Sequence, residues 1–230
     1  MMAARQLALD LPVDASLARE DFLVSPSNEA AYSFIERWPD WPGKGGLVIG
    51  PPGSGKTHLA AIWAARAGAI VTKARALELV DVPDLVGAGA VAVEEADDIA
   101  DHEVALFHLL NLVRENAASV LLTARTAPWR WGLGTADLLS RLRALPAVEI
   151  EVPDDALLRS LLVKLFVDRQ LVVDTTIIDY LARHIDRSFA AARSAVAALD
   201  EEALSRGRRI TRAMVADVLI DRRDADASDT

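Results

Sequence analysis

Residues 50–57 read Gly-Pro-Pro-Gly-Ser-Gly-Lys-Thr and match the phosphate-binding pattern Gly-x4-Gly-Lys-Ser/Thr at every position. An apolar run at residues 47–49 precedes this stretch, and a second at residues 59–63 follows it. The pattern therefore lies between a predicted strand and a predicted helix, which is the setting such a loop requires. There, backbone N–H groups and the helix N-terminus bind an anion. The alternative is a glycine turn that only caps a helix.

Each residue type in this loop suits the binding of a nucleotide with Mg²⁺. Glycines let the backbone curve around an anion. Lys56 is expected to reach the terminal phosphates, and Thr57 to contact the magnesium ion. The loop residues expected to bind nucleotide are Gly50, Pro51, Pro52, Gly53, Ser54, Gly55, Lys56 and Thr57.

The composition is that of an ordinary globular protein. The chain has 230 residues, of which 52% are hydrophobic and 26% charged, and no apolar run is long enough to span a membrane. We expect no signal peptide and, because there is no cysteine, no disulfide or thiolate zinc site. A cytoplasmic location and no membrane partner are therefore expected. The net charge of −9 argues against direct, sequence-specific DNA binding.

Short apolar runs predict four further strands, separated by helical stretches. This alternation predicts a parallel sheet with helices on both faces. Phe107, Trp129 and Trp131 are predicted to pack rather than to bind a ligand. The further strands are expected at residues 69–72, 91–93, 119–123 and 147–152.

After Pro153 the pattern becomes purely helical. Asp154 and Asp174 precede apolar-periodic runs and are predicted helix caps. The fold class expected is α/β, with a small all-α lid. The predicted division is a flexible N-terminal segment at 1–21, a nucleotide-binding core at 22–152, a lid at 153–220 and a disordered polar tail at 221–230.

The residues around the loop resemble a known family. Phe22, Val24, Ser27, Asn28 and Ala31, followed by Gly-Lys-Thr-His-Leu, are similar to the ATPase domain of the replication initiator DnaA and its AAA+ relatives. The resemblance implies an AAA+ P-loop core that binds ADP or ATP with Mg²⁺. It also adds His58 to the nucleotide-binding candidates, the alternative being a helix-surface residue without a chemical role.

Acidic residues follow the predicted strand at 91–93, at the position of the AAA+ Walker B motif. The resemblance implies that Glu94 holds Mg²⁺ through water and that Glu95 polarises the attacking water. AAA+ proteins usually carry Asp where Glu94 stands, so we expect weak intrinsic hydrolysis. A solvated acidic turn is the alternative.

Three arginines match positions at which AAA+ proteins contact phosphate. The sensor 1 position falls on Arg125, with Thr123 close by, where most of the class carries Asn. Arg187 falls at sensor 2, the alternative being a surface or capping residue. Ser140-Arg141-Leu142 resembles the element whose arginine enters a neighbouring subunit's site, so Arg141 is the expected arginine finger in trans.

The N-terminal segment carries a second short motif. Gln6, Leu7, Leu9 and Leu11 resemble the peptide with which replication and repair proteins dock on the bacterial sliding clamp. Apolar side chains on an exposed tail imply a partner. The alternative is a tail that folds back on its own domain.

The order of the motifs is similar to that of the Hda-type regulators, DnaA relatives that act with the DNA-loaded clamp to make DnaA hydrolyse its ATP. Only ten residues follow Ile220, where DnaA continues into a DNA-binding domain. The resemblance implies DnaA and the DNA polymerase III sliding clamp as partners, with a homodimer left open. A helicase loader of the DnaC or IstB kind, a self-sufficient P-loop ATPase or small-molecule kinase, and a scaffold with vestigial nucleotide binding are the alternatives.

Overall fold

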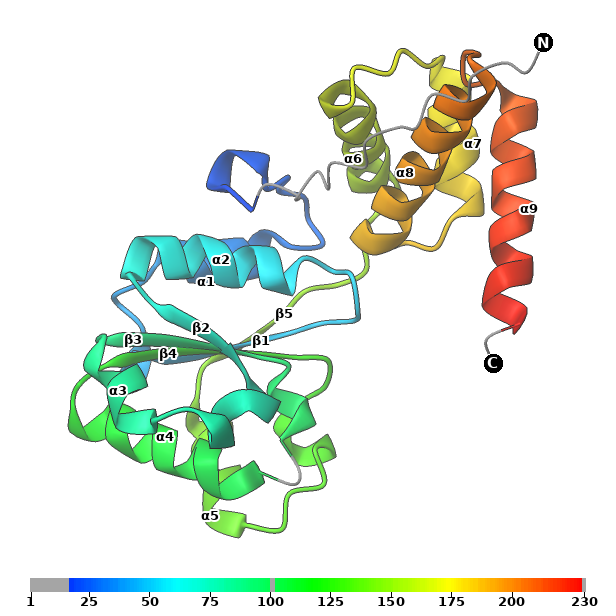
Figure 1. Cartoon of the computed structure of the whole chain (residues 1–230). Coiled ribbons are helices and arrows are strands. Elements are labelled where there is room, and N and C mark those ends of the chain that lie inside the picture. Colours follow the sequence, from blue (N-terminus) through cyan, green and yellow to red (C-terminus); the bar gives the residue numbers. More distant parts are fainter. Residues whose placement is uncertain (1–16, 100–101, 229–230) are drawn as a thin grey trace.

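The computed structural model describes residues 17–99 and 102–228 (Figure 1). A parallel sheet in the order β2-β3-β4-β1-β5 forms the centre of the larger part. The predicted α/β class is confirmed. The strands are β1 (Gly45–Ile49), β2 (Ile70–Lys73), β3 (Ala90–Glu94), β4 (Ser119–Ala124) and β5 (Ala147–Glu149).

The register brings the candidate site residues to one edge. Ile49 pairs with both Ala124 and Glu149, and Lys73 pairs with Glu94. Since all strands are parallel, their carboxyl ends meet at this edge. Ligands bind there in open α/β sheets.

Helices cover both faces of the sheet and form a separate group beyond its edge (Figure 1). Among the described residues, short 3-10 helices lie at Arg19–Asp21, Pro42–Lys44, Ala74–Leu79, Ala96–Asp98 and Pro128–Arg130. The α-helices are α1 (Glu29–Glu36), α2 (Lys56–Ala67), α3 (Val82–Gly87), α4 (Glu103–Glu115), α5 (Ala136–Ala144), α6 (Asp155–Asp168), α7 (Thr175–His184), α8 (Phe189–Arg206) and α9 (Arg212–Ser228).

Alternate strand residues feed two different cores. Val48 and Leu121 pack with α1 and α2 on one face, and Leu47 and Leu122 pack with α3, α4 and α5 on the other. This alternation follows from the two-residue period of a strand. It explains why the buried strands read as continuous apolar runs rather than as alternating ones.

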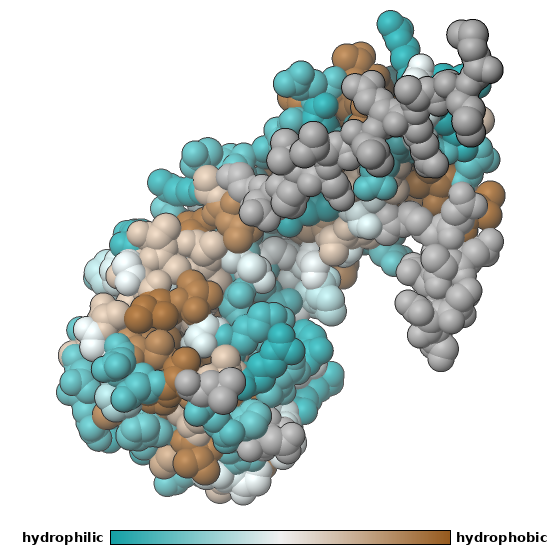
Figure 2. Space-filling model, viewed as in Figure 1, coloured by the Kyte–Doolittle hydropathy of each residue, from teal (hydrophilic) through white to brown (hydrophobic). Residues whose placement is uncertain are grey.

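The edge strand β2 is less buried than the central strands. Its side chains Ile70 and Val71 are exposed. An apolar area lies over the front of the sheet, where β2 runs in Figure 1 (Figure 2). Lys73 ends this strand at the carboxyl edge.

The lid, α6 to α9, has a core of its own, in which leucine, isoleucine and alanine side chains predominate. The predicted caps are confirmed: Asp154 accepts a hydrogen bond from Leu157 N at 2.7 Å, and Asp174 accepts one from Thr176 N at 2.8 Å. None of the helices in the described part of the chain has the length and apolar character needed to cross a membrane.

The side chain of Asn28, at the start of α1, accepts a hydrogen bond from Ser25 N and donates one to Leu23 O. One local expectation is corrected. The segment predicted as a disordered tail is helical as far as Ser228, because α9 continues through it. Its alanines and arginines are good helix formers, and an established helix extends at low cost.

Candidate nucleotide-binding site

The phosphate loop leaves β1 and enters α2 as predicted. Gly53 and Gly55 have φ values of +69° and +101°, which residues with a side chain rarely adopt. Lys56 opens α2, and its Nζ donates hydrogen bonds to the carbonyl oxygens of Gly50 and Pro51, each at 2.8 Å. Burial lowers the pKa of Lys56. The ammonium group is thus held over the concave side of the loop, where a phosphate can replace the two carbonyls.

Two other segments meet this loop. The N–H of Phe189, the first residue of α8, donates to Gly53 O at 2.8 Å. A Cβ on Gly53 would lie 2.9 Å from the Cβ of Ser188, and one on Gly55 would lie 3.5 Å from the ring of Phe22. The absence of a side chain at Gly53 therefore lets the lid approach the loop, while the ring of Phe22 leaves room for ordinary contact at Gly55.

The two candidate Walker B acids lie in different environments. Glu94 ends β3, and its Oε1 is buried. Glu95 follows with φ of +55°, and its carboxylate forms an ion pair with Lys73 Nζ at 2.9 Å. Its N–H donates to Thr123 Oγ1 at 3.3 Å. The acid expected to polarise water is therefore bound to a cation on the neighbouring strand.

The sensor 1 position carries Arg125, whose guanidinium is also held in ion pairs. Arg125 Nε donates to Asp97 Oδ2 at 2.8 Å, and its Nη2 contacts Asp98. Hydrogen bonding to Asp97 raises the pKa of Arg125 further. The expected neighbour Thr123 is buried, and its hydroxyl contacts Glu95 rather than open space. Arg125 therefore has to break its contacts with two carboxylates before it can contact a phosphate.

Several buried polar atoms at this edge have no partner among the described residues: Ser54 Oγ, Glu94 Oε1 and Asp97 Oδ1. A buried polar atom without a hydrogen bond is unfavourable, so these atoms fit a site that takes a polar ligand. No three acidic or histidine side chains converge as a preformed metal centre within the described ranges. Mg²⁺ in nucleotide sites is bound by one or two protein groups together with phosphates, and Thr57 and Glu94 suit that arrangement.

His58 is buried, which excludes the alternative of a helix-surface residue. Its Nε2 lies 2.8 Å from Ala18 O, and its ring packs edge-on against Phe22. Burial lowers the pKa of His58 below its ordinary value of 6.5. The ring therefore holds the lead-in segment on α2, and a direct contact with nucleotide stays a prediction.

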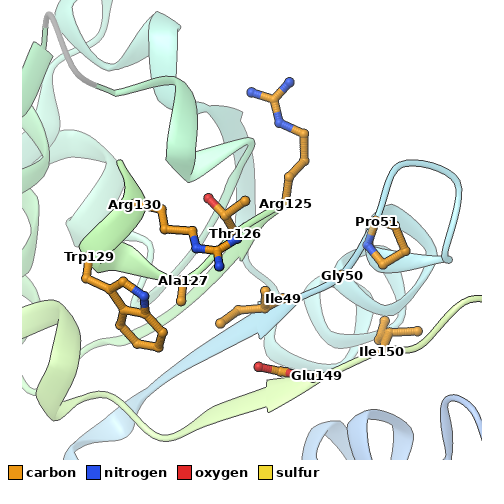
Figure 3. A pocket seen from close by; sticks show the side chains of 10 residues that line it. All are labelled: Ile49, Gly50, Pro51, Arg125, Thr126, Ala127, Trp129, Arg130, Glu149 and Ile150. Carbon is orange, nitrogen blue, oxygen red and sulfur yellow. The ribbon is translucent and has the colours of Figure 1, made fainter. Parts of the chain in front are cut away.

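A cavity of about 350 Å³ adjoins the start of the loop (Figure 3). The expected packing role is confirmed for Trp131, which is buried with its Nε1 donating to Thr126 O at 2.7 Å. It is wrong for Trp129, which is 63% exposed. The cavity is lined by Ile49, Gly50, Pro51, Arg125, Thr126, Ala127, Trp129, Arg130, Glu149 and Ile150.

The remaining two arginines lie outside the phosphate loop. Arg187 forms an ion pair with Asp155 at 2.7 Å within the lid, two residues before the N–H that contacts Gly53. Arg141 lies on α5, on the face of the sheet opposite to α2 (Figure 1), with its guanidinium carbon 4.9 Å from the ring centre of Phe107. The sensor 2 and finger roles stay predictions.

Sequence patterns did not identify the ion-pair partners of Glu95 and Arg125. Lys73 is an ordinary polar residue at a strand end, and Asp97 and Asp98 belong to an acidic run. Strand order alone brings them to Glu95 and Arg125. The clamp-like residues Gln6, Leu7, Leu9 and Leu11 lie outside the described residues.

Comparisons with known proteins identify the fold. No protein-family model and no curated protein sequence matches the chain. Among solved structures, domain III of the Thermotoga maritima replication initiation protein DnaA is similar, with a TM-score of 0.78 and 18% identity over 92% of this chain and 98% of that chain. The chain has an AAA+ fold.

Two further structures are similar over part of their length. AMPPCP-bound DnaA from Aquifex aeolicus has a TM-score of 0.66 and 17% identity, over 80% of this chain and 64% of that chain. The Thermotoga maritima RuvB Holliday junction branch migration motor has a TM-score of 0.60 and 19% identity, over 76% of this chain and 61% of that chain. The AAA+ fold is therefore shared by initiator and motor proteins.

The phosphate loop can be tested by removing its cation. We expect Lys56→Ala to weaken ADP binding by about tenfold or more, because the variant loses a charge-assisted hydrogen bond to phosphate. Calorimetric titration with ADP and Mg²⁺ measures the change. Lys44→Ala is the matched control, since Lys44 donates to Ala117 O at the opposite edge of the sheet. Equal affinities of the two variants would contradict the assignment.

The burial of His58 predicts a dependence of stability on pH. Because its pKa is lowered in the folded state, the unfolded state binds more protons at acid pH. This contribution to stability is complete above pH 6.5, the ordinary pKa, and decreases as the pH falls below it. We expect His58→Gln to lose less stability than the wild type between about pH 7.5 and about pH 5.5. Urea unfolding measures this, with the exposed His108→Gln as control; equal losses in wild type and His58→Gln would refute it.

Proposed function

We propose that this protein is an Hda-type regulator of chromosomal replication initiation, which acts with the DNA-loaded sliding clamp to stimulate ATP hydrolysis by DnaA. The observation that carries the proposal is the position of Arg141. It lies on α5, away from the chain's own phosphate loop, and none of the described carboxylates pairs with it. A guanidinium placed in this way is available to the nucleotide site of another subunit.

The chain's own site supports nucleotide binding more than rapid hydrolysis. Lys73 engages Glu95, and two aspartates engage Arg125. The first ion pair must break before Glu95 can polarise water, and the contacts of Arg125 must break before it can bind a γ-phosphate. We therefore propose that hydrolysis occurs mainly in the partner, and that this chain has weak ATPase activity of its own.

Bound ADP or ATP would then act mainly on conformation. The loop contacts the lid through the hydrogen bond between Phe189 and Gly53. A phosphate that moves Lys56 from the carbonyls of Gly50 and Pro51 changes the loop, and the loop adjoins the start of α8. Nucleotide can therefore bias the angle between core and lid, on which the meeting of two subunits depends.

The proposed partners are DnaA and the sliding clamp. The clamp assignment rests on Gln6, Leu7, Leu9 and Leu11 in the sequence. The similarity to domain III of DnaA supports an AAA+ subunit as the other partner, because AAA+ modules of similar shape can stack. A homodimer, a cytoplasmic location and the absence of sequence-specific DNA contacts belong to the same proposal.

If Arg141 is the arginine finger, its removal should abolish the stimulation of DnaA. With ATP-loaded DnaA and clamp on DNA, we expect Arg141→Ala to abolish stimulation, since a finger in trans contributes about 10³-fold or more to hydrolysis. Release of ADP from DnaA measures the effect. Arg143→Ala is the matched control, because Arg143 lies on the same helix and is exposed.

Other outcomes separate the alternatives. If Arg141→Ala stimulates like the wild type while folding and clamp binding are intact, Arg141 is not the finger. If the wild type itself fails to stimulate, with clamp, DnaA and nucleotide loading verified, binding to the replicative helicase would favour a loader. Steady hydrolysis or phosphoryl transfer by the isolated chain would favour a self-sufficient enzyme.

The N-terminal motif predicts clamp binding. We expect the double change of Gln6 and Leu9 to alanine to reduce affinity for the clamp by about tenfold or more, because anchor residues account for most of the affinity of short docking peptides. Surface plasmon resonance on immobilised clamp measures the affinity. Asp10→Ala is the control, since position 10 lies in the same stretch between two motif leucines. Unchanged binding of the double variant would exclude this motif as the clamp contact.

A further inference from the structure

Helix α5, which carries Arg141, is attached to α4 at its beginning. The carboxylate of Glu103 accepts hydrogen bonds from Gly134 N at 2.6 Å and Thr135 N at 2.9 Å. These N–H groups stand at the start of α5, where a helix has unsatisfied donors. Hydrogen bonds from Thr135 and Gly134 lower the pKa of Glu103. The start of α5 is therefore held by a side chain from α4.

A second contact attaches α5 near its end. The guanidinium of Arg141 lies over the ring of Phe107, with its central carbon 4.9 Å from the ring centre. Phe107 is partly buried and packs on the core between the sheet and α4. Because Glu103 and Phe107 are four residues apart, they lie on one face of α4. This face thus contacts both ends of α5.

A ring rather than a carboxylate is the partner of Arg141, an arrangement that Arg37 and Arg212 share. Arg125 and Arg187 are bound by carboxylates. Arg141 has no such partner among the described residues, and its side chain is half-buried. An aromatic ring attracts the guanidinium to its face. It accepts no hydrogen bond from the N–H groups, which lie at the edge of the guanidinium plane. The N–H donors of Arg141 therefore remain available to an oxyanion.

We infer that Phe107 is a positioning residue for Arg141: its ring orders the guanidinium at the surface and leaves the charge and the N–H groups free for a phosphate of a partner's nucleotide. The inference rests on the proposed finger role. A free arginine side chain samples many rotamers, and ordering it beforehand reduces the entropy lost when the guanidinium engages the phosphate in the transition state. A carboxylate in the ring's place would order the side chain too, but would compete with the phosphate.

The positioning itself can be measured without a partner. In the nuclear magnetic resonance spectrum of the full chain, the side-chain protons of Arg141, assigned from Arg141→Ala, are expected to show an upfield ring-current shift. The shift should disappear in Phe107→Leu and remain in Phe107→Tyr. Val104→Ala is the matched control, because Val104 lies on α4 and is exposed. A wild type without this shift would overturn the inference.

The functional consequence is measured with the same variants in clamp-dependent stimulation of DnaA. We expect Phe107→Leu to lower the maximal rate about two- to fivefold, the range of an exposed cation–π contact, with little change in the concentration of half-maximal effect. Phe107→Tyr should restore the rate. Full stimulation by Phe107→Leu despite a lost ring-current shift would overturn the inference. If the wild type shows the shift but no stimulation, the proposed function fails and the ordering of Arg141 stands.

Discussion

One hydrogen bond joins the two parts of this molecule at the point where nucleotide is expected to bind. The N–H of Phe189 donates to the carbonyl of Gly53, and the approach is close enough that a Cβ on Gly53 would collide with Ser188. At Gly55 the backbone itself favours glycine, with φ of +101°, and the rings of Phe22 and Phe189 lie beside it at ordinary contact distance. The lid and the lead-in segment therefore take their positions from the conformation of the loop. A ligand that changes this loop acts on both.

Two of the cations at the carboxyl edge of the sheet are bound by acids: Lys73 by Glu95, and Arg125 by Asp97. Such pairs hold reactive groups in place but oppose their use, because one partner must be released first. The finger candidate is ordered differently, by an aromatic ring. Two charged groups at the chain's own site are thus held in ion pairs, whereas Arg141 on α5 has no carboxylate partner among the described residues, which suits the proposed action on a partner.

Local features were predictable because neighbouring residues determine them. The phosphate loop, the caps Asp154 and Asp174 and the parallel sheet all follow from spacing and backbone preference. Composition misled at the end of the chain, where charged residues suggested disorder but α9 continues. The prediction that Trp129 packs was also wrong, since the size of a side chain does not determine whether its loop turns it inward or outward. His58 could not be placed, because its partner Ala18 belongs to another segment.

The sequence by itself predicted the AAA+ architecture and the position of the loop at residues 50–57 between a strand and a helix, because both depend on short-range patterns of apolar, glycine and capping residues. Only the tertiary structure decided which side chains meet. Glu95 with Lys73, Arg125 with Asp97, and Arg141 with Phe107 pair across different strands and helices. Such contacts depend on strand order and on how α4 crosses α5, and no local pattern encodes either. The chemistry of the site therefore rests on residue types in the sequence and on pairings that only packing creates.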